Sequence, residues 1–249
     1  MKLPESGQAK ETILQQLKDM KMEDANWRDG KTFSYVYYAG EDVLELTKAA
    51  YEMYFSENAL NPTAFQSLRR METEVIKMAA DLFGGDQQIR GSLTSGGTES
   101  ILMAVKTARS WALQNRPEIE QPEIILAANA HPAFNKACHY FKVKAVVVAV
   151  DANFRADLQQ MRAAIGPNTV MLVASAPAYP QGGIDSVVDI AQMAKANGLL
   201  CHVDACVGGF LLPFLRQIRP QLPAFDFSVD GVTSISADIH KYGYAAKGA

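Results

Sequence analysis

The stretch TVMLVASAPAYPQGGIDSVVDIAQMAKANGLLCHVDACVGGF, residues 169–210, decides the fold of this chain. Residues 169–175 and 199–205 are short apolar runs of strand length, and residues 185–197 between them show helical spacing of apolar side chains. Continuous apolar strands are typical of parallel sheets that helices cover on both faces. The stretch therefore predicts a strand–helix–strand unit of an α/β protein.

The same alternation continues on both sides of this unit, whereas the first third of the chain shows mainly helical spacing. We expect a helical N-terminal segment over residues 1–90 and a large α/β domain, mostly a parallel sheet with helices on both faces, over residues 91–249. The segment is predicted to hold three helices, around residues 14–17, 43–54 and 65–79. Further helices are expected in the domain over residues 98–114, 133–141 and 155–165, with strands over 123–128, 144–150 and 231–236.

The composition is that of a soluble globular protein and excludes several classes. The chain has 249 residues, 48% of them hydrophobic, and its net charge of −3 gives no sign of nucleic-acid binding. The longest apolar run, residues 145–150, is too short to cross a bilayer, and residues 1–20 lack a secretory signal, so we expect no membrane anchor. Three cysteines without a CxxC pair indicate free thiols in a reducing compartment, the cytoplasm.

Chemically active side chains follow the predicted strands. In open α/β sheets, ligands bind outside the carboxyl ends of the strands. His131 comes shortly after the strand at 123–128, Asp204 ends the strand at 199–205, and His240 and Lys241 follow the last strand. This placement is the main evidence from the residues that the chain carries a site.

The stretch TSGGTES, residues 94–100, can bind an anion. Gly96 and Gly97 allow close approach to backbone N–H groups at a helix start, and Thr98 adds a hydroxyl donor. The alternative is an ordinary helix start, with Ser95 or Thr98 as the cap and Glu99 favouring the helix dipole. The sequence leaves both interpretations open.

Strand alternation places His202 and Asp204 on the same side of the sheet. A carboxylate at a strand end can keep the ring nitrogen of a ligand protonated, because an opposite charge raises the pKa of that nitrogen. Two alternatives remain, a capped turn at Asp204 and a zinc site built from His202, Asp204, Cys206 and His240.

Two further residues complete a set of contacts. His131 can stack on a flat ring or serve as a polar helix start, and Lys241 can form a Schiff base with an aldehyde or be a surface lysine. A phosphate cradle, a stacking imidazole, a carboxylate and an aldehyde-binding lysine are together what pyridoxal 5′-phosphate needs. The residues therefore predict that cofactor and an enzyme.

The motifs SGGTESI, AHPAFNKA, HVDACVGGF and VTSISADIHKYGYAAKG resemble the sphingosine-1-phosphate lyases and their bacterial relatives, in the group II pyridoxal-phosphate-dependent decarboxylase family. The resemblance runs from about Tyr35 to the end of the chain and implies the fold-type-I large domain of the aspartate aminotransferase type. It implies that Lys241 carries the cofactor and that Lys247 and Tyr37 reach the substrate. The residues that it assigns to cofactor binding are Gly96, Gly97, Thr98, His131, His202, Asp204, His240 and Lys241.

The resemblance favours a carbon–carbon lyase that cleaves a phosphorylated amino alcohol through an external aldimine. The chain departs from the lyase pattern at Asn61 and Gln181, where the lyases are expected to carry histidines. The alternatives are an amino-acid decarboxylase of the same family and a catalytically inactive fragment, because the chain ends eight residues after Lys241. We expect a partial sequence, exposed strand edges and helix faces, a small-molecule amine substrate, and a complete protein that is a homodimer.

Overall fold

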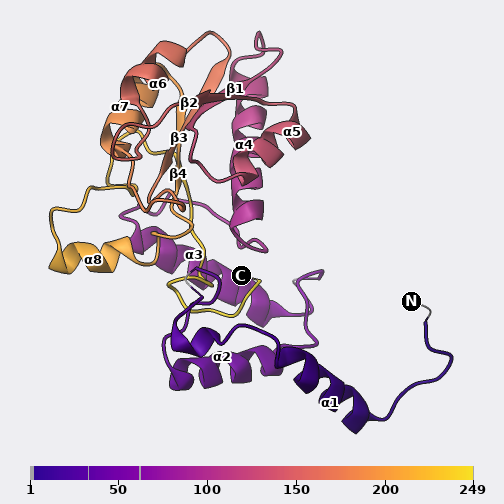
Figure 1. The fold of residues 1–249 in the computed structure, drawn as a ribbon. Coiled ribbons are helices and arrows are strands. Elements are labelled where there is room, and N and C mark those ends of the chain that lie inside the picture. The colour runs from indigo at the N-terminus through magenta and orange to yellow at the C-terminus, as the bar shows by residue number, and fades with distance from the viewer. Residues whose placement is uncertain (1–2, 33, 62, 249) are drawn as a thin grey trace. The chain divides into compact units, whose positions relative to one another are not determined.

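The computed structural model describes residues 3–32, 34–61 and 63–248 of the chain. It separates into two compact units, Met1–Tyr38 and Ala39–Ala249. The first unit contains the helix α1, Lys10–Lys21, and the short 3-10 helix η1, Trp27–Asp29 (Figure 1). The division at residue 90 that the sequence suggested remains a prediction.

The second unit begins with two helices that the sequence predicted, α2 (Glu41–Met53) and α3 (Gln66–Leu82). Helix α3 ends at Leu82, and Gly84 follows with a φ of 65° that lets the N–H of Gly85 turn back onto the carbonyl oxygen of Ala80 at 2.8 Å. Neither helix contains a buried residue. The apolar side chains of Leu46, Met53 and Met78 are exposed, as expected, whereas those of Val75 and Ile76 are half-buried.

A five-stranded parallel sheet forms the centre of the second unit, with the strand order β2-β1-β3-β4-β5. All four pairings of neighbouring strands are parallel, which confirms the predicted sheet. Strand β3, in the middle, is buried along its whole length, because helices cover both of its faces. The strands are β1 (Glu123–Ala127), β2 (Lys144–Val148), β3 (Thr169–Ser175), β4 (Leu200–Asp204) and β5 (Ser234–Ser236).

Helices cover the two faces of the sheet (Figure 1). On one face, α4 (Gly97–Asn115) and α5 (Ala133–Phe141) pack on a core that includes Ile124 and Val173. On the other face, α6 (Leu158–Ala164) and α7 (Val187–Ala196) pack on a core that includes Ile125 and Leu172. Neighbouring strand residues thus enter opposite cores, as the alternation of side chains requires. Helix α8, Leu212–Ile218, was not predicted.

Because the strands are parallel, their carboxyl ends meet at one edge of the sheet. Ser175, Asp204 and Ser236 lie side by side there, at the ends of β3, β4 and β5. The segments that carry His131 and Lys241 leave from the same edge. Within the described parts of the chain, no helix combines the length and the apolar character that a membrane-spanning helix needs.

Candidate functional site

The start of α4 is a glycine turn closed by hydrogen bonds. Gly96 has a φ of 132°, which favours glycine, and α4 begins at Gly97. The Ser95 backbone N–H and hydroxyl both donate to Glu99 Oε2, at 2.6 and 2.7 Å. These bonds lower the pKa of Glu99. The N-cap of α4 is Gly96, with no side-chain capping bond, so the predicted cap at Ser95 or Thr98 is wrong. The first residues of α4 line a cavity that we describe next.

A cavity of about 300 Å³ lies at the carboxyl edge of the sheet. The start of α4, the segment before α5, the turn after β4 and the segment after β5 contribute its walls. Six residues that the sequence predicted for the site come together here, although up to 145 positions separate them in the chain. The lining residues are Ser95, Gly96, Gly97, Thr98, Glu99, Ile101, His131, Cys206, Asp238, His240 and Lys241.

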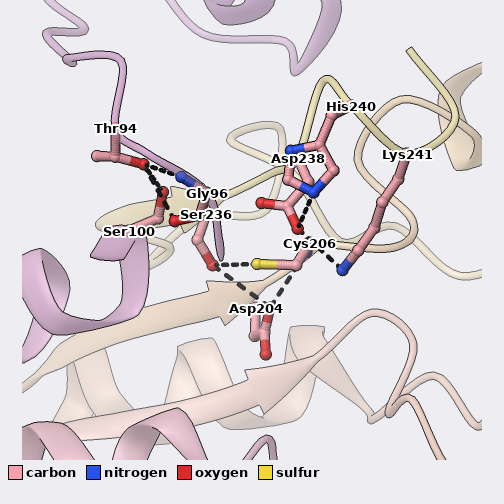
Figure 2. Close-up of polar contacts among 9 residues, drawn as sticks. All are labelled: Thr94, Gly96, Ser100, Asp204, Cys206, Ser236, Asp238, His240 and Lys241. Atoms are coloured by element: carbon pink, nitrogen blue, oxygen red, sulfur yellow. Dashed lines mark hydrogen bonds and ion pairs between the residues drawn. The ribbon is translucent and has the colours of Figure 1, made fainter. Parts of the chain in front are cut away.

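An ion pair between Asp238 and Lys241 lies at this cavity (Figure 2). Lys241 Nζ lies 2.9 Å from Asp238 Oδ2, and His240 Nε2 lies 3.7 Å from the same oxygen. The chain makes a turn here, in which the N–H of Lys241 donates to the carbonyl of Asp238 at 3.3 Å. The sequence motifs gave no role to Asp238. Its position three residues before Lys241 nevertheless indicates that a turn would bring the two side chains together.

Gly97 packs closely against this ion pair. A Cβ at Gly97 would lie 2.8 Å from both carboxylate oxygens of Asp238 and 2.8 Å from Cys206 Sγ. Real Cβ atoms do not approach other atoms so closely, so a side chain would force Asp238 or Cys206 to move. Gly97 therefore lets the start of α4 pack against a carboxylate of the protein itself.

His131 lies in the cavity wall at the start of α5. Its Nδ1 accepts a hydrogen bond from the N–H of Ala133 at 3.1 Å, so the helix-start role suggested by the sequence is present. An accepting Nδ1 leaves the ring proton of the neutral imidazole on Nε2. The backbone of α5 thus fixes the orientation of the ring that is expected to stack on a cofactor.

Asp204 lies at the end of β4, buried behind the cavity wall. Its Oδ1 accepts hydrogen bonds from the N–H of Cys206 at 3.1 Å and from Ser236 Oγ at 3.4 Å (Figure 2). The first of these bonds is the turn-capping contact that the sequence left open. Cys206, not Asp204, lines the cavity directly, and burial with the nearby charges of Asp204 and Asp238 raises the pKa of its thiol.

His202 lies outside the residues that line the 300 Å³ cavity and faces a larger one of about 450 Å³. Its Nδ1 lies 2.9 Å from Ser234 Oγ and its Nε2 lies 3.2 Å from Ser236 Oγ. Burial lowers the pKa of His202 to about 4, although the charge of Asp204 acts in the opposite direction. Ser236 Oγ contacts both His202 and Asp204, so the two side chains lie on the same side of the sheet, as predicted.

The zinc alternative is wrong. Among the residues that the structure describes, no three His, Cys, Asp or Glu side chains are grouped to hold a metal ion. Both ring nitrogens of His202 face serine hydroxyls, and the thiol of Cys206 donates to Ser236 Oγ at 3.5 Å. The ligand types are present in the sequence, but His202 and Cys206 face serines, and His240 faces Asp238.

The two residues that the resemblance assigns to the substrate differ in their placement. Partial desolvation and the charge of Lys241 lower the pKa of Lys247, whereas the charge of Asp238 raises it. Lys247 is therefore close enough to both charges to be affected by them. Tyr37 belongs to the N-terminal unit, Met1–Tyr38, so its part in the site remains a prediction.

Both positions that depart from the lyase pattern bond within the protein. Asn61 Oδ1 accepts hydrogen bonds from the N–H and the hydroxyl of Thr63, at 3.0 and 2.6 Å. Gln181 Oε1 accepts one from Asn129 Nδ2 at 3.2 Å. Amides at both positions accept hydrogen bonds but cannot take up a proton at neutral pH.

The residues around the 300 Å³ cavity fit pyridoxal phosphate. A helix start with two glycines and the hydroxyl of Thr98 suits a phosphate. The imidazole of His131 suits a flat ring, and the amine of Lys241 suits an aldehyde. All of these groups line one cavity, so a single molecule that carries all three features can contact them together.

Known proteins resemble the chain over nearly its whole length. The chain is 45% identical over 247 residues to sphingosine-1-phosphate lyase 1 of Mus musculus, covering 99% of the chain and 43% of the mouse protein. A solved structure of a Burkholderia pseudomallei sphingosine-1-phosphate lyase superposes with a TM-score of 0.91 at 37% identity, over 100% of this chain and 59% of that one. This match confirms the predicted fold.

A more distant relative carries a decarboxylase name. The L-aspartate/L-glutamate decarboxylase of Pyrococcus horikoshii is 33% identical over 245 residues, covering 98% of this chain and 62% of that protein. The chain spans less than half of the length of the mouse lyase. The family model described as the pyridoxal-dependent decarboxylase conserved domain matches residues 1–249, and the chain therefore belongs to the pyridoxal-dependent decarboxylase family.

Proposed function

We propose that this chain is the cofactor-binding part of a pyridoxal-phosphate-dependent carbon–carbon lyase, which cleaves the Cα–Cβ bond of a phosphorylated amino alcohol. The observation that supports this most is the single cavity lined by the glycine turn before α4, His131 and Lys241. When bound, pyridoxal phosphate withdraws electrons from the bond that breaks at the Cα of the substrate. The 45% identity to the mouse lyase supports the choice of reaction.

The start of α4 is proposed to hold the phosphate. Helix α4, which has 19 residues, begins at this point, and the partial positive charge of a helix N-terminus favours an anion. Thr98 can donate a hydroxyl hydrogen bond there, and His240 lines the same cavity. These groups would orient the cofactor so that its aldehyde lies toward Lys241.

His131 and Asp204 are proposed to orient the ring. The bond from the N–H of Ala133 holds the His131 imidazole, so its face can pack on a flat ligand without losing rotational freedom on binding. Asp204 is held through Oδ1 by Cys206 and Ser236. A carboxylate held in this way favours the protonated state of a ring nitrogen placed close to it.

Lys241 is proposed to bond to the aldehyde and later to donate a proton to the substrate Cα. Lys247 is proposed to hold the charged end of the substrate. A phosphate on the substrate would pair with this lysine.

The second candidate is an amino-acid decarboxylase, which would break the bond to the carboxylate instead. The hydrogen-bonded amides of Asn61 and Gln181, at positions where the lyases are expected to carry histidines, favour it. The decarboxylase name of the Pyrococcus relative also supports it. The third candidate is that residues 1–249 alone bind the cofactor but catalyse nothing.

In the test, the complete protein is first loaded with pyridoxal phosphate. Phosphorylated long-chain amino alcohols are then offered as substrates in one assay, and aspartate and glutamate in another. Aldehyde release supports the lyase, whereas carbon dioxide without aldehyde supports the decarboxylase. The matched control is Lys241→Ala, which should release neither product. If the complete protein is active and residues 1–249 bind the cofactor without turnover, the third candidate describes this chain.

We also propose that the complete protein is a homodimer in the cytoplasm. The absence of buried residues along α2 and α3 is consistent with a partner covering these helices. The three cysteines are all free and buried, which suits a reducing compartment. Light scattering of the complete protein and cell fractionation test the two parts of this proposal.

A further inference from the structure

Asp238 is a charged residue of the site to which neither the motifs nor the family resemblance gave a role. Its side chain is only 4% exposed, and its Oδ2 lies 2.9 Å from Lys241 Nζ. His240 Nε2 lies 3.7 Å from the same oxygen (Figure 2). The most buried carboxylate of the cavity wall therefore faces the amine that is expected to carry the cofactor.

The surrounding backbone holds Asp238 in this position. The N–H of Asp238 donates to the carbonyl of Cys206 at 3.3 Å. On the other side, the Cα of Gly97 packs so closely that a Cβ there would lie 2.8 Å from both carboxylate oxygens. The contact with Lys241 is therefore built into the packing between α4 and the segments after β4 and β5.

We propose that Asp238 is a positioning residue, the counter-ion that holds Lys241 as an ammonium ion until the cofactor arrives. This inference rests on the proposed function, in which Lys241 bonds to an aldehyde. An amine adds to an aldehyde carbon, with loss of water, only when its nitrogen lone pair is available. Lys241 must therefore give up a proton to solvent and leave Asp238 before it can form that bond.

Other charged groups face the same pair and belong to its electrostatics. Partial desolvation and the charge of Lys241 lower the pKa of Lys247, whereas the charge of Asp238 raises it. An ammonium beside a buried carboxylate is stabilised more than one in water, because the local dielectric constant is lower. The neighbouring titratable or charged groups are Arg90, Glu99, His131, His202, Asp204, Cys206, His240 and Lys247.

The test measures the reactivity of the Lys241 amine in the cofactor-free protein. Acetic anhydride labels each lysine at a series of pH values, and mass spectrometry of a digest gives the extent at Lys241 relative to the exposed Lys142. In Asp238→Asn, the loss of the counter-ion should make the labelling of Lys241 about tenfold faster at pH 8. The control Asp189→Asn removes an exposed charge from α7 and should change nothing.

Equal labelling of Lys241 in the wild-type chain and Asp238→Asn would overturn the inference. Circular dichroism checks that the variant folds. If it does not, Asp238→Ser removes the same charge with a smaller side chain and takes its place. A separate experiment treats the wild-type protein with pyridoxal phosphate and cyanoborohydride. If no adduct forms on Lys241, the proposed function is contradicted. The labelling with acetic anhydride still decides the role of Asp238.

Discussion

Replacing His202 by glutamine should make the stability of the protein less sensitive to acid. His202 is buried between Ser234 and Ser236, and burial lowers its pKa from 6.5 to about 4. The folded state therefore excludes a proton that the unfolded state binds below pH 6.5. Stability from this group is complete above pH 6.5 and is lost as the pH falls toward 4.

The size of the effect follows from the two pKa values. One pKa unit corresponds to about 1.4 kcal/mol, so a shift of about 2.5 units limits the loss to about 3.4 kcal/mol at low pH. At pH 5 the linkage relation gives a loss of about 2 kcal/mol relative to pH 7. Glutamine can still bond to a serine hydroxyl but does not titrate, so the variant should lack this loss.

Urea unfolding at pH 7 and pH 5 measures the difference in unfolding free energy between the two proteins. We expect that difference to shrink by about 2 kcal/mol at pH 5, because the other titrating groups are common to both proteins and cancel. His139→Gln is the matched control, since His139 is exposed on α5. The unfolding free energy of this variant should change between pH 7 and pH 5 by the same amount as that of the wild type. If the unfolding free energies of His202→Gln and the wild type fall by the same amount between pH 7 and pH 5, the reasoning is refuted.

Three further predictions concern packing and buried groups. Burial raises the pKa of all three thiols, to about 11 for Cys138 and about 12 for Cys201, so a disulfide reagent at pH 8 should titrate none in the native protein and three in urea. Gly97→Ala should destabilise the protein by about 1–3 kcal/mol in urea unfolding, whereas Gly166→Ala, which has open space around it, should cost less than about 1 kcal/mol. Asp185→Asn should lower the melting temperature, because an amide replaces an oxygen that accepts a buried backbone N–H, at a cost of about 1–3 kcal/mol. A melting temperature equal to the wild type would contradict the last prediction.

The sheet could be predicted because its signals are local. Strand β3 has the predicted bounds, since a run of apolar residues between turn residues is visible in the sequence alone. Strand β5 is shorter than predicted, because Gly231 has a φ of 101° and the N–H of Val232 closes a turn onto Val229. Helix α8 was missed because it has only seven residues.

The site was predictable only in part, since its contacts join segments that are far apart. The rule on carboxyl strand ends found His131 and Lys241, which the structure brings to one cavity. The position of Asp238 against Gly97 depends on how α4 packs on the segment after β5, which no local pattern reveals. The serine partners of His202 depend on the pairing of β4 with β5, in which His202 is opposite Ser234.

The hydroxyl of Ser236 has a consequence for where protons lie. An ionised carboxylate can only accept, so the bond between Ser236 and Asp204 uses the one hydrogen of that hydroxyl. The contact at 3.2 Å then requires His202 Nε2 to be the donor, and Nδ1 must accept from Ser234. Ser234, His202, Ser236 and Asp204 thus form a chain of hydrogen bonds in which each side chain donates to the next. The negative charge of Asp204 therefore selects the tautomer of His202, two residues earlier on the same strand.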